Sequence, residues 1–268
     1  MAEIKIGIVG CAGRMGQTLA RLVHQSEGFA LAGGTEAAGH AALGRDLGEV
    51  AGLGPLGLAI GEDSSALFAA AQAVLDFTAP EASVGHAEAA AATGTALVIG
   101  TTGLDAGHDA RIAEAAQRAA IVRAPNMSLC VNLMIALAKE AAASLGEDYD
   151  IEVVEMHHRG KVDAPSGTAL ALGRAVAAGR GIDLEAHSAR ARDGFTGPRR
   201  RGDIGFAVLR GGDVVGEHSV VFAADGERLE LTHRATSRLT FARGALRAAG
   251  WAHDKPPGVY GMADVLGL

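Results

Sequence analysis

Uninterrupted apolar runs alternate with longer helical stretches along roughly the first 120 residues of the chain. Such runs are typical of strands that are buried on both faces of a parallel sheet. They predict strands at Ile4–Val9, Ala30–Glu36, Ala73–Thr78, Ala96–Gly100 and Ala120–Ala124. Stretches rich in Ala, Leu, Glu, Gln and Arg predict helices at Gly13–Gln25, Pro80–Ala92 and Leu104–Arg118. Gly39–Gly61 holds seven glycines and a proline and is expected to be a long loop. The pattern predicts an α/β domain with a doubly wound parallel sheet.

The alternation changes after Asn126, where strands no longer follow helices one by one. The predicted elements there are a helix over Ser128–Leu145, a strand over Asp150–His157, a helix from Ser166, and strands over Val214–Ala223 and Arg228–Thr236. The last two flank an Asp225-Gly226 pair, which supplies the positive φ angles that a tight hairpin turn requires. We therefore expect a second, smaller α+β domain with a mixed sheet. A final helix over Leu239–Gly250 and the tail after it could join either domain.

The first predicted strand runs into a glycine motif, Gly10-Cys11-Ala12-Gly13-Arg14-Met15-Gly16, at the start of the first predicted helix. Glycines at such a junction let the backbone turn tightly and approach a pyrophosphate, which the free N–H groups of the helix start can bind. Arg14 could add a positive charge there. Glu36 lies 20 residues beyond Gly16 at the end of the second strand, where an acidic side chain usually binds the adenosine ribose. Strand, glycine motif and acid together favour a dinucleotide site over a glycine-rich turn without a ligand.

A second candidate site lies at the end of the strand Asp150–His157, in the run EVVEMHHRGKVDAPSGTA from Glu152 to Ala169. The chain has four lysines against 20 arginines, so Lys161 stands out in a composition that otherwise prefers arginine. Lysine is a compact charge with an adjustable pKa, and histidine exchanges a proton near neutral pH. His157 and His158 would face opposite sides of an extended strand, so only one of them is expected to meet a substrate directly.

The same run then opens a helix at Pro165-Ser166-Gly167-Thr168. The N–H groups of a helix start, together with two hydroxyls, suit a carboxylate or a phosphate, so the run predicts an anionic substrate. The residues alone leave an alternative open, in which this is a solvated basic loop and Ser166 serves only as the N-cap.

Composition narrows the choice of function. The chain has 268 residues, 49% of them hydrophobic and 21% charged, with a net charge of −7, which excludes intrinsic disorder and disfavours binding to nucleic acid. We find no membrane-spanning apolar run and no signal peptide, so we expect a cytoplasmic protein. The two cysteines, Cys11 and Cys130, form no disulfide framework, and no Cys/His cluster has zinc spacing, so no metal is expected. A small molecule is the expected partner.

The run over Glu152–Ala169 closely resembles the signature of the dihydrodipicolinate reductase (4-hydroxy-tetrahydrodipicolinate reductase) family of the diaminopimelate and lysine pathway. The resemblance extends along nearly the whole chain. Further similar segments are Gly13–Gly16, Asp76–Thr78, Ile99–Gly103, Ala124–Asn126, Gly216–His218, Thr232–Ala235, Arg238 and Phe241–Ala242.

The resemblance implies an oxidoreductase that reduces 4-hydroxy-tetrahydrodipicolinate with NADH or NADPH, and it implies a homotetramer. It implies a Rossmann-like dinucleotide-binding domain over residues 1–126, completed by 239–268, and a substrate-binding and tetramerisation domain over 127–238. His157 would be the proton donor and Lys161 would stabilise charge, while His158, Ser166, Gly167 and Thr168 would bind the substrate carboxylates. The implied cofactor-binding residues are Gly10, Gly13, Arg14, Met15, Glu36, Phe77, Gly100, Thr101, Thr102, Ala124, Pro125, Asn126 and Met127.

The chain departs from the family pattern at three positions. Many members carry an arginine after the ribose-binding acid, where it can meet the 2′-phosphate of NADPH, but here Glu36 is followed by Ala37. Ala79 also replaces an arginine of some relatives, so we expect NADH to serve at least as well as NADPH. Gly160 replaces a histidine of some relatives and is expected to be neutral.

Two other functions fit parts of the sequence. A related two-domain dehydrogenase, such as an aspartate or homoserine dehydrogenase, would share the glycine motif but would not be expected to carry the run from Lys161 to Ala169. A catalytically inactive sensor of the nucleotide would be expected to lose His157 or Lys161 first, and both are present.

Overall fold

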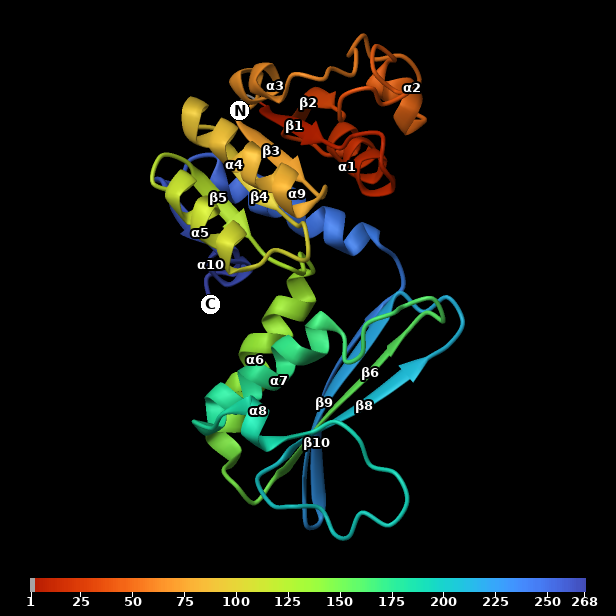
Figure 1. Cartoon of the computed structure of the whole chain (residues 1–268), viewed down its shortest axis with the longest axis vertical. Helices are drawn as coiled ribbons and strands as arrows, with labels where there is room; N and C mark the ends of the chain where they lie inside the picture. The colour runs from red at the N-terminus through yellow and green to blue at the C-terminus, as the bar shows by residue number, and fades with distance from the viewer. Residues whose placement is uncertain (1–2) are drawn as a thin grey trace. The chain divides into compact units, whose positions relative to one another are not determined.

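The computed structural model describes residues 3–268 and divides the chain into two compact units (Figure 1). The first unit comprises the described residues up to Ser128 together with Leu239–Gly267, and the second comprises Leu129–Arg238. Both divisions fall at the starts of long helices.

The first unit is an α/β fold around a six-stranded parallel sheet with the order β11-β5-β4-β3-β1-β2. Its elements are β1 (Ile4–Val9), α1 (Arg14–Gln25), β2 (Phe29–Thr35), α2 (Leu47–Ala51), α3 (Ser64–Ala70), β3 (Ala73–Asp76), α4 (Pro80–Thr93), β4 (Ala96–Ile99), α5 (Ala106–Ala115), β5 (Ala120–Arg123), α9 (Leu239–Ala252), β11 (Gly258–Tyr260) and α10 (Met262–Leu266). Helices α1 and α9 pack together on the sheet, while α3, α4 and α5 form a second packed row. The doubly wound parallel sheet predicted from the sequence is confirmed.

Three helices of this unit were not predicted, namely α2, α3 and α10. Two of them, α2 and α3, follow an aspartate that caps their first turn. The segment expected to be one long loop contains α2, where the Asp46 carboxylate accepts a hydrogen bond from the Glu49 amide. The same carboxylate also accepts from the amides of Leu56, Gly57 and Leu58, so it holds the loop that follows α2 against the start of that helix. Helix α3 begins at Asp63 and buries Leu67 and Phe68 in the core.

The chain end joins the first unit. Strand β11 pairs in parallel with β5 at the sheet edge, and α10 packs on α9. The residue pattern alone had left open which domain takes the tail, because a three-residue strand at an edge carries too little pattern to decide it. The family resemblance had assigned residues 239–268 to the first domain.

The second unit has a mixed five-stranded sheet with the order β10-β9-β6-β8-β7. Its elements are α6 (Leu129–Leu145), β6 (Asp150–His157), α7 (Gly167–Arg180), α8 (Leu184–His187), β7 (Ser188–Ala189), β8 (Ile204–Arg210), β9 (Gly216–Ala224) and β10 (Glu227–Ala235). The predicted hairpin is confirmed as β9 and β10, with Gly226 at φ +85° in its turn. Strand β8, which the sequence did not reveal, runs parallel to β6.

Alternate residues of β6 explain how this sheet is covered. Ile151, Val153, Glu155 and His157 are buried on the side where α6 and α7 complete the core. The alternate residues, which are only partly buried, are Asp150, Glu152, Val154 and Met156. One face of the strand therefore faces the helical layer and ends in ionisable side chains.

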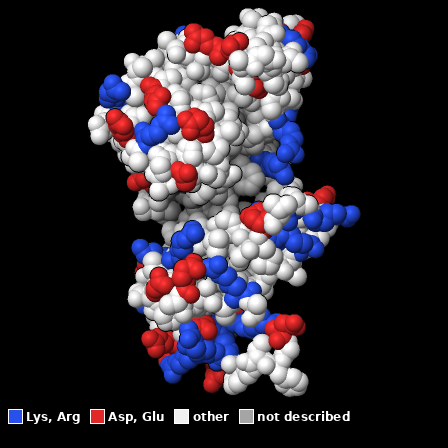
Figure 2. All heavy atoms as spheres, in the orientation of Figure 1, with Lys and Arg blue, Asp and Glu red and all other residues white. Residues whose placement is uncertain are grey.

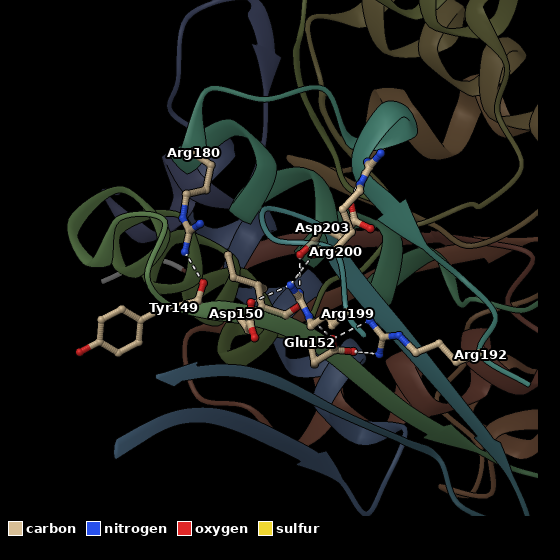
Figure 3. Close-up of polar contacts among 9 residues, drawn as sticks. Tyr149, Asp150, Glu152, Arg180, Arg192, Arg199, Arg200 and Asp203 are labelled. Carbon is tan, nitrogen blue, oxygen red and sulfur yellow. Dashed lines mark hydrogen bonds and ion pairs between the residues drawn. The ribbon is translucent and has the colours of Figure 1, made fainter. Parts of the chain in front are cut away.

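Charged side chains of both signs are interspersed on the visible face of each unit (Figure 2). In the second unit, segment 190–203 is held to the sheet by arginines (Figure 3). Arg192 makes a two-pronged pair with Glu152, at 2.8 Å for both contacts. Arg199 donates to Glu152 at 3.0 Å, to Asp150 at 2.7 Å and to the backbone carbonyls of Ile151 and Asp203. This network fixes a segment that has almost no regular secondary structure.

Candidate functional site

The glycine motif forms a tight turn between β1 and α1. Gly10 has φ +66°, a conformation that L side chains rarely adopt. A Cβ on Gly16 would come within 2.2 Å of the Gly10 carbonyl oxygen, so Gly16 allows α1 to pack against the turn. Helix α1 begins after Gly13, which supplies no side-chain cap to its first N–H groups. Arg14 is exposed and Met15 is partly buried on the first turn. The helix start is thus open to an anionic group.

Glu36 follows β2 and reaches this turn. Its Oε1 accepts a hydrogen bond from the Ala12 amide at 2.7 Å. Ala37, next in the chain, is exposed. Cys11 is fully buried, and burial, helped by the charge of Glu36, raises the pKa of its thiol to about 12. Cys11 is therefore a packing residue whose thiol stays protonated at neutral pH.

A buried carboxylate, Asp76, organises the ends of β3 and β4. It is fully buried and accepts from the Thr78 amide at 2.9 Å, from the Thr78 hydroxyl at 2.6 Å and from the Thr101 hydroxyl at 3.2 Å. Its other oxygen lies 2.9 Å from Nδ1 of His86. Burial raises the pKa of Asp76, but the hydrogen bond and charge of His86, with Thr78 and Ser83, outweigh it and leave the pKa below its usual value.

The other predicted cofactor-binding residues of this unit follow the same strand ends. Phe77 lies against Gly100, where an added Cβ would meet the ring at 2.2 Å. Thr102 follows Thr101, and Ala124 to Met127 follow β5, with Ala124 and Met127 buried. The Asn126 side chain accepts from the Ser128 amide at 2.8 Å. All the predicted cofactor-binding residues thus follow the carboxyl ends of five strands of one parallel sheet, where such sheets usually bind ligands.

In the second unit, the carboxyl end of β6 carries a buried cluster of ionisable residues. His157 Nδ1 lies 2.5 Å from Glu155 Oε2. Arg210, at the end of β8, donates to both oxygens of Glu155 at 2.8 and 2.9 Å. His218, from β9, meets the His157 ring edge-on with centroids 5.0 Å apart. Its Nε2 lies 3.2 Å from Ser166 Oγ.

Burial controls the protonation of these histidines. It lowers the pKa of His157, and the hydrogen bond and charge of Glu155 offset this only in part. It lowers the pKa of His218 to about 4, so that ring is neutral at neutral pH. Burial also raises the pKa of Glu155, but hydrogen bonds from Arg210, His157 and the Ser166 amide leave it below its usual value. His157 thus faces a carboxylate that is ionised at neutral pH.

The loop after β6 carries the remaining predicted substrate residues. Lys161 Nζ lies 2.7 Å from Asp163 Oδ1, and its side chain is 21% exposed. His158 lies just past the strand end and is partly buried. Ser166 is the N-cap of α7, because its Oγ accepts from the Ala169 amide at 3.2 Å. Gly167 and Thr168 form the first turn of that helix.

Three residues of this cluster escaped the sequence analysis as candidates, namely Glu155, Arg210 and His218. Glu155 had a usable signal, because a residue two positions before His157 on a strand shares its face. Arg210 had none, and His218 had only its place in the family-like segment Gly216–His218, since both reach the site through the pairing of β8 and β9 with β6.

Two broader searches concern the described residues 3–268 as a whole. No group of three or more His, Cys, Asp or Glu side chains there could hold a metal ion. None of the helices over the same range is long and apolar enough to cross a membrane.

Comparison with known proteins gives matches over the whole chain. Residues 4–127 match the family described as "Dihydrodipicolinate reductase, N-terminus", and residues 130–266 match "Dihydrodipicolinate reductase, C-terminus". A 4-hydroxy-tetrahydrodipicolinate reductase of Afipia carboxidovorans is 54% identical over 268 residues, covering 100% of this chain and 98% of the relative. One from Brucella abortus is 57% identical over 262 residues, covering 97% and 98%.

Solved structures agree on the fold. A dipicolinate-bound dihydrodipicolinate reductase from Paenisporosarcina sp. TG-14 has a TM-score of 0.76 at 22% identity, covering 98% of both chains. A probable dehydrogenase from Thermotoga maritima has a TM-score of 0.62 at 12% identity, covering 98% of this chain and 92% of that one.

Proposed function

This chain belongs to the dihydrodipicolinate reductase family, and from that premise we propose that it is a 4-hydroxy-tetrahydrodipicolinate reductase of lysine biosynthesis. The observation that carries the proposal is the cluster at the end of β6, where the buried His157, the loop with Lys161 and the start of α7 come together. It offers a proton-exchanging group, a lysine cation and a helix N-terminus, which suit an anionic substrate that gains a proton.

The first unit fits a dinucleotide. The start of α1 has no side-chain cap, Gly10 has a conformation that needs glycine, and the Glu36 carboxylate already reaches the turn. We assign the pyrophosphate to Gly10, Gly13, Arg14 and Met15 and the ribose to Glu36. The nicotinamide end is assigned to Phe77, Gly100, Thr101, Thr102 and Ala124 to Met127. Reduced nicotinamide, when bound, supplies the hydride for the reaction.

The second unit performs the proton and charge chemistry. The substrate ring is a conjugated imine dicarboxylate that develops negative charge as it is reduced, so a nearby cation stabilises the transition state. Lys161 supplies that cation, and His157 donates the proton that completes the reduced ring. His158, Ser166, Gly167 and Thr168 hold the carboxylates and orient the ring. Starting from the hydroxylated substrate, one water leaves, and one hydride and one proton are added.

The Ser166 hydroxyl has a structural role besides the proposed binding of the substrate. It accepts from the Ala169 amide and pairs with His218, so it organises the helix start as well as facing the substrate site. The N-cap function that the sequence left as an alternative therefore coexists with the proposed binding function.

For the cofactor, we propose that NADH serves at least as well as NADPH. Ala37 and Ala79 are both exposed and uncharged, so neither offers a partner to a 2′-phosphate. An Ala37→Arg variant should raise the ratio of kcat/KM with NADPH to that with NADH by about tenfold or more, since a charge-assisted hydrogen bond contributes roughly 1.5–3 kcal/mol. An unchanged ratio in this variant would contradict the assignment of the 2′ position.

We further propose a homotetramer working in the cytoplasm. The partly exposed face of β6 and the exposed Leu209 on β8 support an interface between copies. Light scattering should then give about four times the chain mass of 27.1 kDa.

The proposed reaction is tested by following NADH and NADPH oxidation in near-ultraviolet light. Substrate is made in situ from pyruvate and aspartate semialdehyde by the preceding synthase. Oxidation should require the synthase and should fall by about 10²–10⁴ in His157→Ala and Lys161→Ala. Lys139→Ala, which removes an exposed lysine from α6, is the matched control and should keep wild-type activity. Folded protein that binds NADH but oxidises neither cofactor would refute the reductase and favour an inactive sensor.

A further inference from the structure

Glu155 is 1% exposed, and each of its two carboxylate oxygens has two hydrogen-bonding partners. Oε2 pairs with His157 Nδ1 at 2.5 Å and accepts from Arg210 at 2.8 Å. Oε1 accepts from Arg210 at 2.9 Å and from the Ser166 amide at 3.0 Å. A carboxylate held in four directions by three residues cannot rotate freely, so its position relative to the His157 ring is fixed.

We propose that Glu155, clamped by Arg210, is the positioning residue that makes His157 a proton donor through Nε2. The proposal rests on the reductase function proposed above. Glu155 touches neither substrate nor cofactor in this assignment; it acts through His157.

The hydrogen bond decides which ring nitrogen exchanges its proton. An ionised carboxylate can only accept, so Nδ1 of His157 must carry a proton in both the neutral and the charged ring. The proton that comes and goes is then on Nε2, and the imidazolium is the donating form. Carboxylates orient histidines in the same manner in catalytic triads and in metal sites.

The backbone explains why this pair is rigid. Glu155 and His157 are two residues apart on β6 and share its buried face. Arg210 pairs in register with His157 on the parallel strand β8, and it also donates to the Asp163 carbonyl at 2.6 Å. The clamp therefore fixes both the carboxylate and the loop that carries Lys161.

The charge of Glu155 shifts the pKa of His157 in the opposite direction to burial and to the nearby positive charges. Burial lowers the pKa of His157, and the positive charges of Lys161 and Arg210 lower it further, while Glu155 raises it. The remaining titratable neighbour is His218 on β9, which is neutral because burial holds its pKa at about 4. Without Glu155, less of the imidazolium would be present at neutral pH.

A purely structural ion pair between Glu155 and Arg210 is the competing explanation, and the two explanations predict different results. In Glu155→Gln, the amide keeps the shape and can still accept from Nδ1, but the charge is gone. We expect kcat to fall about 10- to 100-fold with KM little changed, which is the usual effect of changing a residue that supports an active histidine. The alkaline fall of kcat should move to lower pH by about one unit or more.

Glu152→Gln is the matched control. Glu152 lies on the same strand, points to the other face and is also held by two arginines, Arg192 and Arg199. It should change stability but leave the pH profile of kcat where it is. If both variants keep the wild-type profile, or both shift it equally, Glu155 does not position His157.

A measurement on the unmodified protein covers the case in which Glu155→Gln does not fold. Nitrogen-15 chemical shifts of His157 over pH should show Nδ1 protonated throughout and Nε2 titrating. A neutral ring protonated on Nε2 would overturn the proposal. Because this measurement needs no turnover, it still decides the role of Glu155 if the wild-type protein fails to reduce the substrate, which would refute the proposed function instead.

Discussion

Replacing Gly16 with alanine tests whether the turn at the start of α1 is set by close backbone packing. The added Cβ would lie 2.2 Å from the Gly10 carbonyl oxygen and 2.6 Å from Cys11 Cα. Real Cβ atoms come no closer than 3.0 Å, so helix or turn must move by 3.0 − 2.2 = 0.8 Å. Both clashing groups are backbone, which no rotamer change can move aside.

The expected cost combines two opposing contributions. Overpacking typically destabilises a protein by about 1–3 kcal/mol. Alanine in place of glycine within a helix returns about 0.5–1 kcal/mol. We therefore expect Gly16→Ala to destabilise the first unit by about 1–2 kcal/mol, which lowers its Tm by about 2–8 °C.

Thermal unfolding of purified variants provides the assay, with two alanine variants for comparison. Gly85 lies exposed in α4 with nothing within 4 Å of an added Cβ, so Gly85→Ala should raise the Tm slightly through helix propensity alone. Gly13→Ala meets only the Gly10 oxygen at 3.3 Å and should leave the Tm nearly unchanged. It should still weaken NADH binding, measured by fluorescence, because its methyl group covers the start of α1. A Gly16→Ala protein at least as stable as wild type would refute the packing argument.

Three further predictions address other parts of the chain. Arg199→Ala should destabilise the second unit by about 1–3 kcal/mol in urea unfolding, because it removes contacts to two carboxylates and three backbone carbonyls. Arg201→Ala, which removes an exposed ion pair, should change stability by less than about 0.5 kcal/mol, and equal effects of the two variants would contradict this. A thiol reagent should label Cys130, which is exposed, within minutes and Cys11 only after unfolding, and two fast thiols in the native protein would show that Cys11 is not buried. The pKa of Asp76 is lower in the folded than in the unfolded protein, so its contribution to stability is full above its unfolded pKa of about 3.9 and is lost as the pH falls through the folded value. In Asp76→Asn, the free energy of unfolding should therefore depend less on pH below about pH 4. An unchanged midpoint of acid unfolding would count against an ionised Asp76.

The sequence predicted the first unit well because its signals are local. Strands that are buried on both faces read as apolar runs, and the five predicted strands agree with β1 to β5 to within two residues. The short helices α2, α3 and α10 were missed, since an element of five or seven residues is shorter than the window that a helical period needs.

The second unit was predicted less completely because its sheet is mixed. Strand β8 has apolar residues without a regular alternation, and its first half is buried while its middle is exposed. Only pairing with β6 distinguishes it from loop. The partners of His157 were missed for the same reason, because Arg210 and His218 lie 53 and 61 residues after it in the chain.

The pairing of β8 with β6 shows that the candidate sites of both units lie at the carboxyl ends of parallel strands. In the first unit, the candidate cofactor residues follow the carboxyl ends of parallel strands and a helix start. In the second, β6, α7 and β8 form a parallel β-α-β unit within a mixed sheet, and His157 and Arg210 are the last residues of its two strands. Parallel strands bring their carboxyl ends to one edge, and the connecting helix begins at that edge with its positive dipole end. Arg210 pairs with the buried Glu155 carboxylate, and the Ser166 amide donates a hydrogen bond to it, so its charge is compensated within the fold. Under the proposed function, the start of α7 and Lys161, which here pairs with Asp163, are the groups that bind an anionic substrate at the same end of β6.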